Sequence, residues 1–156
     1  MDSGNHIVIE LDKEAAPITV SNFQNLVSES FFDGIIFHRI IPGFMIQGGD
    51  PTGTGRGGSK TEIKGEFASN GVDNRLSHVR GAVSMARTQI PDSASSQFFI
   101  CHGDSLFLDG EYAAFGRVID GMDEVDRIAG LKTNRSDFPD TPPVMDQVFF
   151  VALTEI

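Results

Sequence analysis

The sequence predicts a mainly β fold, in which seven or eight short strands close into an antiparallel barrel capped by two helices. Three observations support this prediction. The 156 residues include 17 Gly and 7 Pro, a density of turn-forming residues that helix-rich proteins rarely reach. Short segments rich in β-branched residues recur along the chain, and only two segments show helical periodicity. The 13 Phe, with one Tyr and no Trp, suit the interior of a compact barrel.

The expected elements follow from local patterns. Two segments have apolar residues at helical spacing, 18–28 and 122–129, and Thr19 or Ser21 is expected to cap the first helix. A glycine-rich loop occupies 48–59. An open α+β sandwich would also satisfy these patterns, so the local signals leave both architectures open. Strands are expected over residues 6–11, 35–41, 44–47, 82–86, 97–101, 113–119 and 147–156.

Length and composition narrow the classes of function. The length is that of one domain, so we expect a single domain over residues 1–156. A net charge of −10 without a Lys/Arg run argues against nucleic-acid binding. Neither a membrane-spanning apolar run nor a signal-peptide pattern is visible. The single cysteine, Cys101, excludes an intrachain disulfide and fits a reducing compartment, so we expect a cytoplasmic monomer.

The first candidate site segment reads FHRIIPGFMIQGGD, residues 37–50. Arg39 interrupts an otherwise apolar strand, and an unpaired arginine is costly to bury, so its side chain is expected at an opening. Phe44, Met45 and Gln47 follow a Pro-Gly turn and combine large apolar groups with an amide. A functional site and a barrel-end arginine satisfied by backbone carbonyls explain this pattern equally well.

Two later segments carry similar groups. In SQFFIC, residues 96–101, the strand period places Gln97, Phe99 and Cys101 on one face, although a core strand with a polar end is the simpler interpretation. The segment LFLDGEY, residues 106–112, is a turn with several large apolar side chains. Such side chains either bind a ligand or pack beneath the loop, and packing is the simpler interpretation.

Taken together, FHRIIPGFMIQGGDPTGTGRGG, SMAR, SQFFI and FLDGEYAAFGRV resemble the cyclophilin family in order and spacing, over nearly the whole chain. At three positions that differ from the best-known members, described below, the residues look more like those of bacterial members. The resemblance implies a closed eight-stranded antiparallel barrel with two capping helices, peptidyl-prolyl cis-trans isomerase activity, and Arg39 as the catalytic group. It also implies a set of residues that bind the proline-containing peptide: Phe44, Met45, Gln47, Gly55, Ala86, Arg87, Gln97, Phe99, Phe107, Leu108 and Tyr112.

Three positions depart from the best-known members, which have Trp at Phe107, His at Tyr112 and Asn at Arg87. Because Phe lacks the indole N–H donor, the resemblance implies weakened binding of the inhibitor cyclosporin. Peptide-bond rotation breaks no covalent bond, so no metal or cofactor is expected. The expected partners are proline-containing peptides and unfolded or folding proteins. The alternative is a non-catalytic proline-peptide binding module, which the intact Arg39 disfavours.

Other motif matches are weak. Gly53-x-Gly55-x-x-Gly58 fits a dinucleotide-binding pattern, but no helical segment follows it. Ser95, Ser96, His102 and Asp104 lie close in sequence, yet a hydrolase triad is defined by geometry, and the chain has no nucleophile elbow. Isolated histidines are more often packed or hydrogen-bonded residues than ligands or bases.

Overall fold

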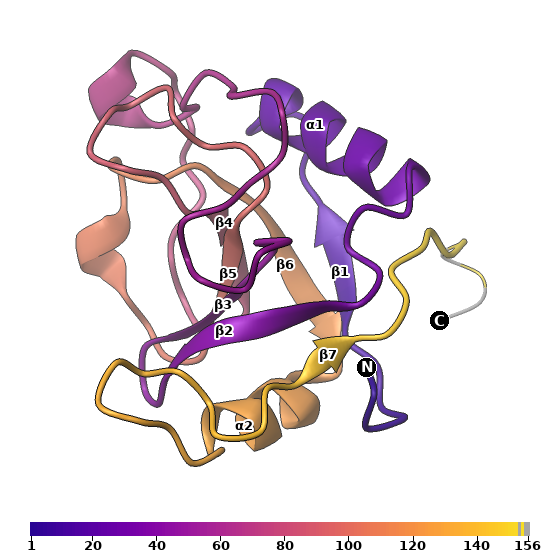
Figure 1. The fold of residues 1–156 in the computed structure, drawn as a ribbon. Helices are drawn as coiled ribbons and strands as arrows, with labels where there is room; N and C mark the ends of the chain where they lie inside the picture. Colours follow the sequence, from indigo (N-terminus) through magenta and orange to yellow (C-terminus); the bar gives the residue numbers. More distant parts are fainter. Residues whose placement is uncertain (153, 155–156) are drawn as a thin grey trace.

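The computed structural model describes residues 1–152 and 154. In this part of the chain, seven antiparallel strands form one curled sheet, and two α-helices lie at its opposite ends (Figure 1). The helices are α1 (Pro17–Ser28) and α2 (Met122–Ala129), and two short 3-10 turns are η1 (Ala68–Asn70) and η2 (Leu106–Leu108). The strands are β1 (Val8–Leu11), β2 (Ile35–Ile41), β3 (Met45–Gly48), β4 (Ala82–Met85), β5 (Phe98–Cys101), β6 (Ala114–Asp120) and β7 (Val144–Met145).

The strand order is β1-β6-β4-β5-β3-β2-β7, and every pairing is antiparallel. The expected fold class, mainly β with two helices, is confirmed, and the single sheet does not support the sandwich alternative. The described residues form seven strands in a curled half-barrel rather than a closed barrel of eight. The N-terminal segment lies beside β7, where the backbone N–H of Asp2 donates to the carbonyl oxygen of Val144 (3.0 Å).

The predicted final strand over 147–156 is wrong where the structure describes it, and residues 153, 155 and 156 lie outside the described part. Only β7 pairs with β2, and Met145 lies opposite Ile35, the first residue of β2. The chain therefore runs past the end of its partner strand, and β-branched residues alone do not hold an extended segment in a sheet. Beyond that point Phe149 and Phe150 are exposed.

The predicted N-cap of α1 is also wrong. Ala16 occupies the N-cap position without a side-chain hydrogen bond, and Pro17 begins the helix, where its missing N–H costs nothing. Thr19 instead lies inside the first turn, where its backbone N–H and hydroxyl both donate to Oε1 of the buried Glu66 (2.6 and 2.7 Å). A carboxylate distant in sequence thus satisfies the start of the helix.

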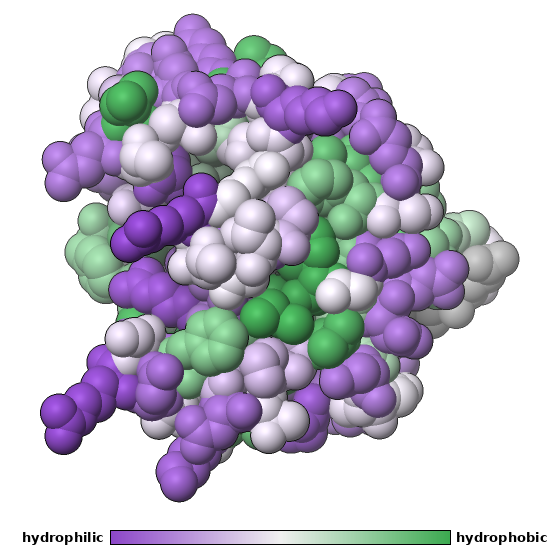
Figure 2. Space-filling view, viewed as in Figure 1, coloured by the Kyte–Doolittle hydropathy of each residue, from purple (hydrophilic) through white to green (hydrophobic). Residues whose placement is uncertain are grey.

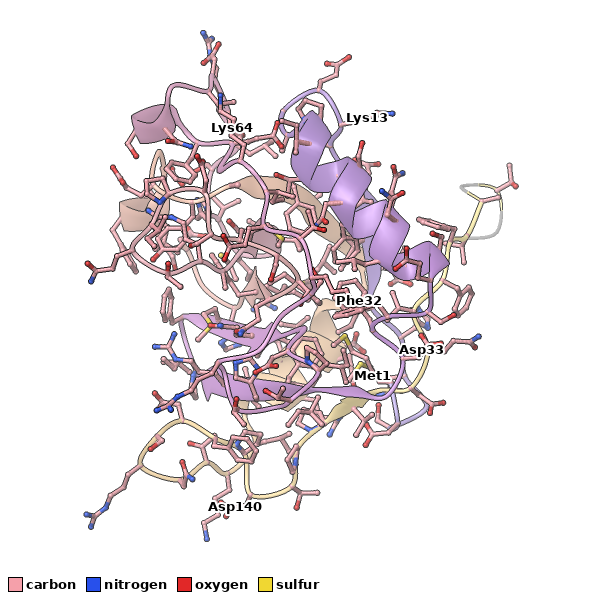
Figure 3. The ribbon with its side chains drawn as sticks, turned by 45° about the horizontal axis from the view of Figure 1, so that its top comes forward. Met1, Lys13, Phe32, Asp33, Lys64 and Asp140 are labelled. Carbon is pink, nitrogen blue, oxygen red and sulfur yellow. The ribbon has the colours of Figure 1, made fainter. Side chains whose placement is uncertain are left out.

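The main core lies between the sheet and the helices and is rich in phenylalanine. The ring of Phe23 on α1 lies 4.9 Å from that of Phe32, 5.4 Å from Phe98 and 5.2 Å from Phe115, measured between centroids. Figure 3 labels Phe32 in the interior beside α1, whereas Lys13, Lys64 and Asp140 lie at the outside. On the face drawn in Figure 2, hydrophilic side chains surround a smaller hydrophobic area. The aromatic packing is what the Phe-rich composition suggested.

The other face of three central strands carries a second, smaller cluster. Alternation along β3 sends Ile46 into the main core and Met45 to the opposite face, and β5 does the same with Ile100 and Phe99. This second cluster contains Met45, Ala82, Phe99, Cys101 and Leu108, with Ile41, Phe44, Ala86 and Tyr112 packed at its edge. It forms the floor of the candidate site.

Candidate active site

A pocket of about 140 Å³ opens on this second face. Its walls come from β2, β3, β5 and η2, from the turn between β2 and β3, and from the segments that follow β4 and precede β6. Nine of the residues expected at the site line it: Arg39, Phe44, Met45, Gln47, Ala86, Arg87, Phe99, Leu108 and Tyr112. Tertiary structure thus brings four separate sequence segments to one place.

Arg39 is the exposed residue of β2, between the buried His38 and Ile40. A register shift between Phe37 and Arg39 breaks the strict alternation, so His38 can be buried while Arg39 faces the pocket. Among the described residues, the guanidinium of Arg39 has neither a hydrogen bond nor an ion pair. The interpretation of Arg39 as a barrel-end arginine satisfied by carbonyls therefore finds no support. Burial lowers the pKa of His38, so its neutral ring adds no charge beside Arg39.

The apolar floor is held by packing. Met45, Phe99 and Leu108 are almost completely buried, and the ring of Tyr112 meets that of Phe99 edge-on at 6.0 Å. Gln97 is half-buried directly before β5 and its side chain contacts Gln47, so Gln97, Phe99 and Cys101 share one face as the strand period predicted. Such a floor can hold a flat aliphatic ring without offering it hydrogen bonds.

The amides at the polar side form a relay. Gln47, directly across from Arg39 in the β2–β3 pairing, donates through Nε2 to Oε1 of Gln97 (2.9 Å). Gln97 in turn donates through Nε2 to the carbonyl oxygens of Gly55 (3.0 Å) and Gly57 (2.8 Å) in the glycine-rich loop. Gly55 thus contributes through Gln97 rather than by lining the pocket. The second N–H and the oxygen of the Gln47 amide remain for a ligand.

The glycine-rich loop is itself organised by Asp50, which the sequence reasoning missed. Its carboxylate accepts hydrogen bonds from the backbone N–H groups of Thr52, Thr54, Gly55 and Gly57 and from the Thr52 hydroxyl. Burial alone would raise the pKa of Asp50, but these donors lower it to about 2. An acidic residue within a glycine-rich loop, followed after one proline by a run of Thr and Gly, was the available signal, since such loops offer many free N–H groups.

Arg87 lines the pocket, but its guanidinium already has partners within the protein. Its guanidinium is sandwiched between the rings of Phe67 and Tyr112, 4.7 Å from each centroid. It also donates to the carbonyl oxygens of Glu111 (2.7 and 3.0 Å) and Thr88 (2.9 Å). The added charge expected at the peptide-binding edge therefore braces Tyr112, and Phe67 is a further residue that sequence reasoning missed.

Phe107 is 73% accessible and lies at the rim rather than in the pocket. Its ring centroid is 5.6 Å from that of Phe44, so the two rings form one continuous apolar edge.

His78 is a buried support that sequence reasoning treated only as an isolated histidine. Its Nδ1 lies 2.8 Å from Oδ1 of Asp109, its Nε2 lies 2.8 Å from the hydroxyl of Ser84, and its ring stacks on Phe99 at 6.0 Å. Burial lowers the pKa of His78, and the Asp109 carboxylate offsets this only in part. The arrangement has the contacts of a Ser-His-Asp triad, but Ser84 is fully buried and cannot reach a substrate.

Comparisons with known proteins agree with this geometry. Residues 1–148 match the family model described as cyclophilin type peptidyl-prolyl cis-trans isomerase/CLD. The chain is 47% identical to peptidyl-prolyl cis-trans isomerase ppi1 of Schizosaccharomyces pombe, over 87% of this chain and 86% of that protein. It is 49% identical to a peptidyl-prolyl cis-trans isomerase of Acinetobacter baylyi, over 83% of this chain and 69% of that protein.

A solved structure shares the fold. The crystal structure of a cyclophilin type peptidyl-prolyl cis-trans isomerase of Cryptosporidium parvum, determined in the presence of the dipeptide Ala-Pro, superposes with a TM-score of 0.86. The two sequences are 32% identical, and the match spans 94% of this chain and 92% of the Cryptosporidium chain. The chain therefore belongs to the cyclophilin-type peptidyl-prolyl cis-trans isomerase family. Its activity is the cis-trans isomerisation of peptide bonds that precede proline, and the non-catalytic alternative is not favoured.

Among residues 1–152 and 154, no helix is long and apolar enough to cross a membrane.

Proposed function

We propose that the pocket binds the proline of an Xaa-Pro segment and that Arg39 is the catalytic group. The observation that carries this proposal is the exposed guanidinium of Arg39, which has no partner among the described residues and borders an apolar floor. Every donor of that guanidinium is available to a ligand, and its charge does not change at any working pH.

The reaction needs a site that prefers a twisted amide. Rotation about a peptide bond costs about 18–20 kcal/mol because amide resonance is lost. In the twisted state the prolyl nitrogen becomes pyramidal and gains a lone pair, which a planar amide lacks. A guanidinium N–H that donates to this lone pair stabilises the transition state selectively. A charged hydrogen bond of this kind contributes about 2–3 kcal/mol.

The remaining residues hold the substrate still. Met45, Phe99 and Leu108 contact the proline ring, with Phe44 and Phe107 at its edge. The Gln47 amide and backbone groups near Ala86 and Arg87 bind the flanking peptide groups. Positioning the ring while the preceding carbonyl rotates lowers the entropic part of the barrier.

We further propose that the chain acts on folding proteins as well as short peptides, as one domain and as a monomer in the cytoplasm. A shallow pocket with few side-chain-specific contacts supports a broad range of substrates, and one continuous sheet supports a single domain. The single, buried, free thiol of Cys101 fits a reducing compartment.

The test is a cis-to-trans assay on a short Ala-Pro peptide, comparing the parent chain with Arg39→Ala and with Arg135→Ala. Arg135 is a matched control, since it is an exposed arginine outside the pocket. We expect Arg39→Ala to lower kcat/KM at least tenfold, about 1.4 kcal/mol, and Arg135→Ala to match the parent. Equal activities of all three chains would refute the role of Arg39, and a parent chain that binds the peptide without turnover would refute the enzymatic proposal.

A further inference from the structure

The turn between β2 and β3 sets the position of one pocket wall. The backbone N–H of Phe44 donates to the carbonyl oxygen of Ile41 (3.0 Å), Pro42 follows Ile41, and Gly43 has a positive φ of 78°. These features define a type II turn, with proline at its second and glycine at its third position. The turn hydrogen bond leaves the N–H of Gly43 free. The residue that leaves this turn is Phe44, which lines the pocket.

The segment after β5 packs closely against this turn. The backbone N–H groups of His102 and Gly103 donate to the carbonyl oxygen of Phe44 (2.9 and 3.4 Å). A Cβ atom at Gly103 would overlap the carbonyl oxygen of Gly43, so only glycine allows this approach. The free N–H of Gly43 then donates to Nδ1 of His102 (2.8 Å). Backbone and side chain of the same residue therefore hold both ends of the Gly43–Phe44 pair.

The hydrogen bond from Gly43 requires one tautomer of His102. Nδ1 can accept only if it carries no hydrogen, and in a neutral ring Nε2 then carries it. Nε2 lies 2.9 Å from Oδ1 of Asp126 on α2, an acceptor well placed for that hydrogen. Asp126 is fixed in turn by two contacts from Arg80 (2.7 and 2.8 Å), and Arg80 also donates to the carbonyl oxygen of His102 (2.9 Å). The Arg80 guanidinium, first through its hydrogen bond, keeps the pKa of Asp126 below its ordinary value.

We propose that His102 is a positioning residue of the isomerase, which holds the β2–β3 turn in its type II form and so fixes Phe44 in the pocket wall. A type II and a type I turn differ chiefly by rotation of the central peptide group, which carries the Gly43 N–H. His102 accepts that N–H in one orientation only. The inference rests on the proposed function of the pocket, but its structural part stands independently of catalysis.

The expected kinetic consequence is specific. The proline ring contacts Phe44 in the planar and the twisted states alike, so a looser wall weakens binding of both. Loss of such uniform binding raises KM and leaves kcat nearly unchanged, whereas loss of Arg39 lowers kcat. The two roles are therefore distinguishable in one assay.

Two amide variants, each of which reproduces one ring nitrogen, separate the roles of Nδ1 and Nε2. His102→Asn places an amide oxygen close to the position of Nδ1 and keeps an acceptor for Gly43, whereas His102→Gln places its amide near Nε2 and keeps only the contact with Asp126. For an Ala-Pro peptide we expect His102→Gln to raise KM about threefold or more with kcat within about twofold, and His102→Asn to stay within about twofold of the parent in both. His6→Gln is the matched control, since exposed His6 also contacts an aspartate, Asp120 (2.7 Å), away from the pocket.

A spectroscopic measurement tests the inference without catalysis. In the parent chain, ¹⁵N NMR should show His102 protonated at Nε2 and unprotonated at Nδ1, and the Gly43 amide resonance should shift in His102→Gln more than in His102→Asn. An Nδ1-protonated ring in the parent, or equal KM values for the two variants, would overturn the proposal. An inactive parent chain with the expected tautomer would refute the isomerase mechanism and leave the positioning contact intact.

Discussion

Replacing Asp50 with Asn should destabilise the protein by an amount that depends on pH. The carboxylate of Asp50 is 1% exposed and accepts hydrogen bonds from four backbone N–H groups and one hydroxyl. The Asn amide has the same shape but no charge, and its NH₂ group would face donors from which it cannot accept a hydrogen bond. The substitution therefore removes acceptor capacity in the loop that holds the Gln97–Gln47 relay.

The magnitude follows from the pKa of Asp50, which falls from its ordinary value of 3.8 to about 2 in the folded chain. A carboxyl with a lowered folded pKa contributes stability above its unfolded pKa and loses it as the pH falls through the folded value. The contribution is about 2–3 kcal/mol at pH 7, and about half of it remains at pH 3.

Urea unfolding of the parent and Asp50→Asn at pH 7, 5 and 3 measures this difference. We expect the gap in unfolding free energy to be nearly constant from pH 7 to 5 and then to shrink by about 1 kcal/mol at pH 3. At that pH the Asp50 carboxyl is largely protonated in the unfolded parent but still ionised in the folded parent, so unfolding takes up a proton and becomes easier. A gap that does not change across this range would show that the loop does not depend on the Asp50 charge and would refute the reasoning.

Two further predictions concern the pocket and its floor. Burial, reinforced by the carboxylates of Asp109 and Asp104, raises the pKa of the Cys101 thiol to about 12. A thiol reagent at pH 8 should therefore label the native chain at least about a hundredfold more slowly than the urea-unfolded chain, and equal rates would contradict this. Phe107→Trp adds an indole N–H at the exposed rim, and by calorimetry it should strengthen cyclosporin binding up to about tenfold, or 1.4 kcal/mol. An unchanged affinity would mean that the missing donor is not what limits inhibitor binding.

The sequence could predict those features that depend on local pattern or on long ordered motifs. The periodicities located both helices and six strands within a residue or two, because apolar spacing reports which side of an element is buried. The resemblance carried by FHRIIPGFMIQGGD and the segments after it named the residues that the fold brings around one pocket.

Tertiary structure alone decided what each polar side chain meets. Thr19 was a candidate helix cap, but its backbone N–H and hydroxyl donate to the buried Glu66, 47 positions away. The sequence predicted that Arg87 adds a charge at the peptide-binding edge, but its guanidinium stacks on the rings of Phe67 and Tyr112 and donates to the Glu111 carbonyl. The tail from residue 147 has strand-forming residues, but its partner strand has already ended. Local sequence determines which conformations and burial patterns are favourable, whereas a hydrogen bond or ladder also needs a partner, and the partner's position is set by the fold of the whole chain.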